Sequence, residues 1–122
     1  MKKVTESERD DFRNEFMHYV DMLRCKDWGV MFESSDDPSL MASIVCDHGL
    51  RECTVQLCRH YNEKIQGPLN VTELARHEAI HLSLADLSNK AGKRYITIEE
   101  LLEAEELAVI RLSRMIERLE TK

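Results

Sequence analysis

The sequence predicts an α+β domain, in which a leading helix and a small three-stranded sheet precede two further helices. Hydrophobic residues recur every three or four positions near both ends of the chain, which is typical of helices, and alternate with polar residues in its middle, which is typical of strands. The length of 122 residues suits a single domain spanning residues 1–122. Roughly two-thirds of the surface of such a chain can be buried, enough for one hydrophobic core.

Residues 6–26 are expected to form the first helix, because Phe12, Phe16, Tyr19, Val20 and Leu23 share one helical face. The apolar segment 28–33 is expected to be a strand, and the turn-forming segment 34–38 follows it. Residues 40–46 and 52–59 flank the turn-like tripeptide Asp47-His48-Gly49 and predict a hairpin.

Gly67 and Pro68 end this region, and two helices are expected after it. The first begins after the N-cap Asn70, with Glu73 at the capping-box position, and runs to about Lys90 before the stop signal Ala91-Gly92. The second begins near Thr97, with Glu100 three residues later, and runs to about Leu119.

Charge and composition exclude several classes of function. The 17 Lys and Arg residues against 23 Asp and Glu give a net charge of −6, unlike the basic surface of nucleic-acid-binding proteins. No apolar run approaches the ~18 residues that a membrane span needs. The N-terminal residues lack the apolar region of a secretory signal, and four cysteines without such a signal favour free thiols. We therefore expect a cytoplasmic protein that binds neither nucleic acid nor membrane.

The segment His77-Glu78-Ala79-Ile80-His81 is an H-E-x-x-H motif within a predicted helix. Residues four positions apart return to nearly the same helical face, so His77 and His81 are able to bind one Zn²⁺ together. Glu78 projects beside that site, where it is able to take a proton from a metal-bound water.

The last predicted helix offers a third ligand. Its expected apolar stripe comprises Ile98, Leu102, Val109, Leu112, Ile116 and Leu119. Glu105 occupies the remaining position of that stripe, where a carboxylate is costly unless a metal or another group compensates its charge. Glu106 lies at the edge of the stripe and is the alternative ligand, because the rotation of a helix is uncertain when it is inferred from sequence.

An H-E-x-x-H helix followed by a glutamate on the next helix resembles the arrangement of gluzincin zinc metallopeptidases. The short chain with its leading helix and small sheet resembles the minimal members, the minigluzincins. The stretches RHEAIHLSLADL and EAEELAVIRLSRMIERL are similar to small metallopeptidase-like proteins of tailed bacteriophages. The resemblance covers residues 70–119, and the N-terminal half only by the order of its elements.

This resemblance implies a zincin-like domain that hydrolyses peptide bonds through a zinc-activated water, with Glu78 as the general base. It implies His77, His81 and either Glu105 or Glu106 as metal ligands. A peptide or protein substrate would pair as an extra strand with the sheet edge beside the motif helix. The alternative is an inactive, zinc-stabilised module that binds peptides with the same fold. Larger gluzincins add a His or Tyr that stabilises the oxyanion, and Tyr95, Tyr61 and His60 are the candidates here.

Other metal-binding residue types carry weaker signals. Cys46, His48, Cys53, Cys58 and His60 lack the paired C-x₂-C spacing of structural zinc sites, and buried thiols are the better interpretation. Asp86 lies five residues after His81, about 140° away around the helix, and is expected to be a supporting or surface residue.

Overall fold

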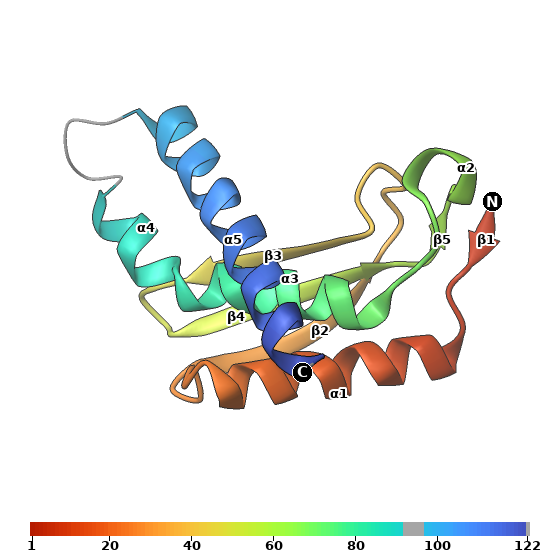
Figure 1. The fold of residues 1–122 in the computed structure, drawn as a ribbon, viewed down its shortest axis with the longest axis horizontal. Helices are drawn as coiled ribbons and strands as arrows, with labels where there is room; N and C mark the ends of the chain where they lie inside the picture. The colour runs from red at the N-terminus through yellow and green to blue at the C-terminus, as the bar shows by residue number, and fades with distance from the viewer. Residues whose placement is uncertain (92–96, 122) are drawn as a thin grey trace.

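The computed structural model describes residues 1–91 and 97–121, which form the expected α+β order (Figure 1). The helices are α1 Glu6–Met22, α2 Glu63–Gln66, α3 Val71–Ser83, α4 Ala85–Ala91 and α5 Ile98–Glu120. The strands are β1 Lys2–Lys3, β2 Gly29–Ser35, β3 Ala42–Asp47, β4 Glu52–Cys58 and β5 His60–Tyr61. None of the described helices combines the length and the apolar character needed to cross a membrane.

Three strands form the main sheet, in the order β2–β4–β3. β3 and β4 are antiparallel neighbours with Asp47 opposite Glu52, which confirms the predicted hairpin. β2 lies parallel to β4, a pairing that the sequence pattern does not predict. The chain between β2 and β3 therefore passes across β4, and β3 becomes an edge strand. β1 and β5 form a separate antiparallel pair.

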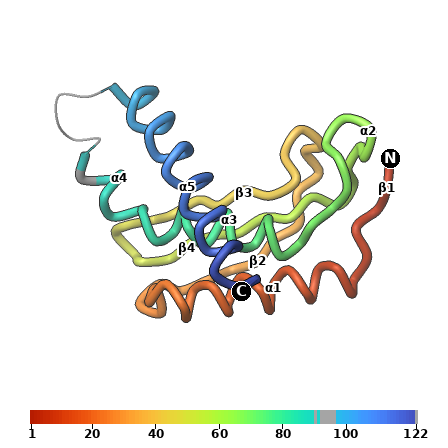
Figure 2. The backbone as a smooth tube through the Cα atoms, viewed as in Figure 1, coloured from red at the N-terminus to blue at the C-terminus, as the bar shows by residue number. Residues whose placement is uncertain are grey.

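The main core lies between one face of this sheet and the helices α1 and α3 (Figures 1 and 2). The predicted stripe of α1 is buried in it, at Phe12, Phe16, Tyr19 and Val20. On β4 the buried side chains alternate as expected, at Cys53, Val55 and Leu57. Helix α5 contacts the opposite side of α3, and its C-terminal end reaches α1, where the Tyr19 hydroxyl donates to Glu120 at 2.7 Å.

Two helices end earlier than the sequence predicts. α1 ends at Met22 instead of near Lys26, because Arg24 adopts a left-handed backbone conformation with φ 60°. The helix expected to continue to Lys90 is divided at Leu84 into α3 and α4. The Ser83 hydroxyl donates to the Ile80 carbonyl at 2.7 Å, a local bond that bends helices. The stop signal at Gly92 lies outside the described residues.

The apolar stripe predicted for α5 is correct only at its centre. Val109 is buried, and Leu112 and Ile116 are half-buried. The outer members of the predicted stripe are exposed, at 57% for Ile98, 55% for Leu102 and 61% for Leu119. The first turns of α5 extend past the body of the molecule beside α4, which leaves their apolar side chains uncovered (Figure 1).

Candidate metal centre

His77, Glu78 and His81 lie on α3, on the part of the helix that α5 crosses. The amide group of Glu73 donates to the Asn70 side chain at 3.0 Å, so Asn70 caps α3 as predicted. The rings of His77 and His81 project side by side, with their centroids 5.0 Å apart. α3 therefore presents two imidazole rings toward α5.

Both rings converge on Glu106. His77 Nε2 lies 2.8 Å from one carboxylate oxygen of Glu106, and His81 Nε2 lies 2.9 Å from the other. Ligand atoms of the three residues lie within 4.8 Å of one another, so this group could hold a metal ion. Tetrahedral zinc would need donor atoms about 3.3 Å apart, so the side chains would have to shift to bind it. The Glu106 side chain is 48% exposed and has room for that movement.

The neighbouring Glu105 contacts the opposite side of the His81 ring. Its Oε1 lies 3.0 Å from His81 Nδ1, and its side chain is only 11% exposed. A carboxylate only accepts hydrogen bonds, so an Nδ1–H donated to Glu105 would leave the lone pair of Nε2 for a bound metal ion. The two glutamates that the sequence leaves as alternatives thus have different contacts. Glu106 joins the donor group, and Glu105 orients His81.

Glu78 is buried, with 6% of its surface exposed. Burial raises the pKa of its carboxyl group from 4.5 to about 7, and the negative charge of Glu106 adds to the effect while His81 opposes it. Burial also lowers the pKa of His77, although Glu106 acts in the other direction. Near neutral pH Glu78 therefore exchanges a proton easily, and His77 keeps a neutral ring suited to metal binding.

A groove of about 730 Å³ opens beside these residues. The edge strand β3 lines one side, α3 contributes the motif residues, and α4 with the first turns of α5 lines the other side. Much of the lining is apolar, from Leu40, Ala42, Ile44, Ala85, Ile98, Leu101 and Leu102. The candidate metal centre is thus open to a ligand with apolar side chains.

The cysteine and histidine candidates do not gather into a second metal-binding group among the described residues. Cys53 and Cys58 are buried, while Cys46 lines the groove. Burial raises the pKa of the Cys46 thiol to about 11 and that of Cys53 to about 12, so neither thiol is a ready thiolate ligand.

The remaining candidates lie away from the donor group. Asp86 accepts a hydrogen bond from Arg51 and lies 3.3 Å from Nδ1 of His48, a residue that lines the groove. His60 and Tyr61 belong to β5 and do not line the groove, and Tyr95 lies outside the described residues.

Sequence reasoning missed Arg76 and Ser113, which join α3 to α5. Arg76 is 5% exposed, and its Nε donates to the Ser113 hydroxyl at 2.8 Å. Ser113 lies within the apolar stripe of α5, and this position was the available signal, because a buried hydroxyl group needs a hydrogen-bond partner on a neighbouring element.

Comparison of the chain with protein-family models, with curated proteins and with solved structures found no match.

Proposed function

We propose that this protein is a zinc-dependent metallopeptidase, with His77, His81 and Glu106 as the metal ligands. The observation that supports it most is the convergence of two imidazole Nε2 atoms and one carboxylate from a second helix. Three protein ligands with a fourth position left for water are typical of catalytic zinc sites. The buried Glu78 and the open groove beside the ligands support catalysis rather than a closed structural site.

Each residue has a distinct part in the proposed hydrolysis. Zinc bound at this site would activate a water molecule and polarise the scissile carbonyl group. Glu78 would accept the proton of the attacking water and then donate it to the leaving amine. Glu105 holds the Nδ1 proton of His81 and keeps Nε2 free for the metal.

The substrate in this proposal is an extended peptide that pairs with the free edge of β3. Cys58 N–H donates to the Met41 carbonyl at 2.9 Å, which identifies these opposite residues as a hydrogen-bonded pair. Such pairs alternate along an antiparallel ladder, so the backbone groups of Ala42, Ile44 and Cys46 point away from β4. All three residues line the groove, so a peptide bonded to them would lie beside Glu78.

Metal analysis of the purified protein tests the ligand set. We expect about one zinc per chain from a single site, loss of zinc in His77→Ala, and severe weakening in Glu106→Ala. Glu105→Ala should weaken zinc affinity by only about 10–100-fold, as for other carboxylates that orient a ligating histidine. If Glu105→Ala weakens zinc binding more than Glu106→Ala, then Glu105 is the ligand and Glu106 is the supporting residue. Absence of metal after refolding with zinc would refute the metal centre.

A peptide-library cleavage assay with Glu78→Gln tests the enzyme. The variant should keep its zinc and lose at least about 100-fold in turnover, because it lacks the general base. Glu73→Gln is the matched control, since Glu73 is an exposed glutamate on the same helix. If the zinc-loaded wild type binds peptides but cleaves none, the protein is the peptide-binding module instead.

A further inference from the structure

Helix α5 has little buried apolar surface to hold it in place. Its buried residues are Val109 and Ser113, out of a length of 23 residues. Leu112 and Ile116 are half-buried beside them. Apolar contacts are not directional, so these residues fix the rotation of the helix less precisely than polar contacts do. On the N-terminal side of Val109, the polar contacts are those of Glu105 and Glu106 with the histidines.

On the C-terminal side of Val109, the polar contacts are the Tyr19 hydroxyl of α1, which donates to Glu120, and the buried Arg76 of α3. Its Nε donates to Ser113 at 2.8 Å and its Nη2 to Glu117 at 3.2 Å. Its guanidinium carbon also lies 6.0 Å from the centre of the Tyr19 ring. Leaving a buried guanidinium donor without a partner is costly, so this contact favours the helix rotation that turns Ser113 toward α3.

The same rotation determines where Glu106 points. At ~100° per residue, Glu106, Ser113 and Glu117 lie within about 40° of one another on one face of α5. Arg76 directly precedes His77 on α3, so the two contacts connect the same pair of helices. Turning Ser113 and Glu117 toward Arg76 therefore turns Glu106 toward the histidines.

We infer that Arg76 is a positioning residue for the metal centre, which sets the rotation of α5 and thereby places Glu106 against His77 and His81. The inference depends on the proposed metal centre. This role is more specific than a general contribution to stability, because it concerns the position of one metal ligand, Glu106.

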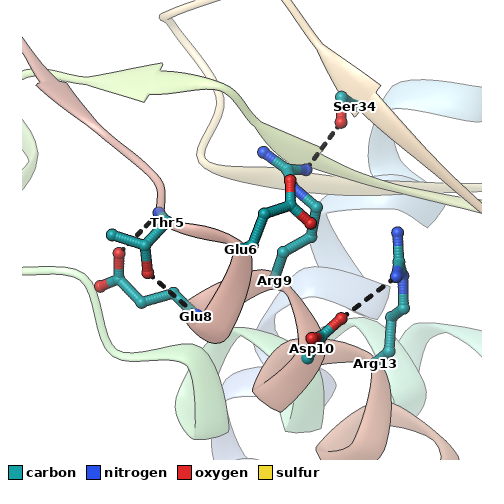
Figure 3. A network of polar contacts seen from close by, with 7 residues as sticks. All are labelled: Thr5, Glu6, Glu8, Arg9, Asp10, Arg13 and Ser34. Atoms are coloured by element: carbon teal, nitrogen blue, oxygen red, sulfur yellow. Dashed lines mark hydrogen bonds and ion pairs between the residues drawn. The ribbon is translucent and has the colours of Figure 1, made fainter.

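Cobalt(II) titration of Arg76→Met tests this role, because the visible absorption of bound cobalt depends on its ligands. Methionine keeps an unbranched apolar side chain but removes every donor. The matched control is Arg9→Met, since the Arg9 side chain is 11% exposed and donates to Ser34 at 2.7 Å, joining α1 to β2 (Figure 3). Arg76→Met should lose about 10-fold or more in cobalt affinity and change the spectrum. Arg9→Met should lower the melting temperature but leave the cobalt affinity and the cobalt spectrum unchanged.

Combining Arg76→Met with Glu106→Gln shows whether Arg76 acts through Glu106. If it does, Glu106→Gln weakens cobalt binding much less in the Arg76→Met background than in the wild type. Losses that multiply independently, or wild-type affinity and spectrum in Arg76→Met, would overturn the inference. Ser113→Ala removes one hydrogen-bond acceptor and provides the same comparison if Arg76→Met does not fold. A wild type that binds neither cobalt nor zinc would refute the metal centre, and the role of Arg76 with it.

Discussion

Helices α1 and α5 both pack against α3, yet different interactions hold them there. α1 has 17 residues and buries an aromatic and aliphatic stripe, Phe12, Phe16, Tyr19 and Val20. α5 has 23 residues and buries only Val109 and Ser113. Leu112 and Ile116 of α5 are half-buried, and charged side chains, among them Glu105, Glu106 and Glu117, also contact α3.

This difference shows that apolar burial holds α1 in place, whereas polar contacts account for much of the attachment of α5. Apolar burial between α1, the sheet and α3 provides most of the free energy of folding, and it tolerates small movements. Hydrogen-bonded ionic contacts require defined distances and angles, which suits the part that the proposed metal centre gives to the carboxylates of α5. Three measurements test this difference between the two helices.

The largest effect should come from truncating the core under α1. Phe16 is fully buried and packs edge-on against Phe32 with ring centroids 5.7 Å apart. Phe16→Ala should lower the free energy of unfolding by about 3–5 kcal/mol in urea denaturation. Val109→Ala should cost only about 1–2 kcal/mol, because it removes two methyl groups. Zinc affinity measured on the folded protein should show the opposite order, with Val109→Ala weakening zinc binding more than Phe16→Ala. A loss of stability in Val109→Ala as large as in Phe16→Ala would contradict the comparison.

Glu78→Gln should change the pH dependence of stability in the metal-free protein. The folded protein holds the Glu78 proton up to about pH 7, while the unfolded chain releases it near 4.5. Stability is therefore lost as pH rises through this interval, by ~1–3 kcal/mol. The variant lacks this loss, so it should be more stable than the wild type at pH 8 and similar near pH 4.

Urea denaturation in the presence of a chelator, from pH 4 to 8, measures this difference. Burial lowers the pKa of His77, so its contribution has the opposite sign and is lost as pH falls below 6.5. His77 is present in both proteins, and its contribution cancels when the two curves are subtracted. Equal stability of the variant and the wild type at pH 8 would show that Glu78 is not held in a costly charged state.

Local sequence patterns predicted the parts of the fold that depend on local interactions. The stripe of α1, the β3–β4 hairpin and the caps at Asn70 and Thr97 each arise from residues that are close in sequence. The parallel pairing of β2 with β4 joins strands separated by another strand, and no local pattern encodes it. At the division at Leu84 the Ser83 hydroxyl donates back to the Ile80 carbonyl, a contact that the spacing of the apolar residues does not encode.

The candidate site shows the same limit. The spacing of His77 and His81 predicts that they share a face, because both are on one helix. Glu105 and Glu106 are adjacent, about 100° apart, and only the rotation of α5 decides which one meets both Nε2 atoms. That rotation depends on contacts such as the one between Arg76 and Ser113, which are 37 residues apart in sequence.

The smallest effect on stability should come from the exposed start of α5. Leu102 is 55% exposed and lines the groove, whereas Leu107 is 47% exposed on the same helix and does not line it. Leu102→Ser and Leu107→Ser should each change the free energy of unfolding by less than about 0.5 kcal/mol. Leu102→Ser alone should reduce kcat/KM for peptides with large apolar side chains, by about 10-fold.

The pair of variants distinguishes an apolar surface that binds substrate from one that is simply exposed. Equal losses in both would mean that the peptide does not lie along the groove between β3 and α5. A loss confined to Leu102→Ser, without a change in stability, would show that the start of α5 carries apolar residues for the ligand rather than for the core. The apolar residues of α1 are buried against the sheet and α3. Those at the start of α5 would instead contact the bound peptide, which is a second difference between the two helices.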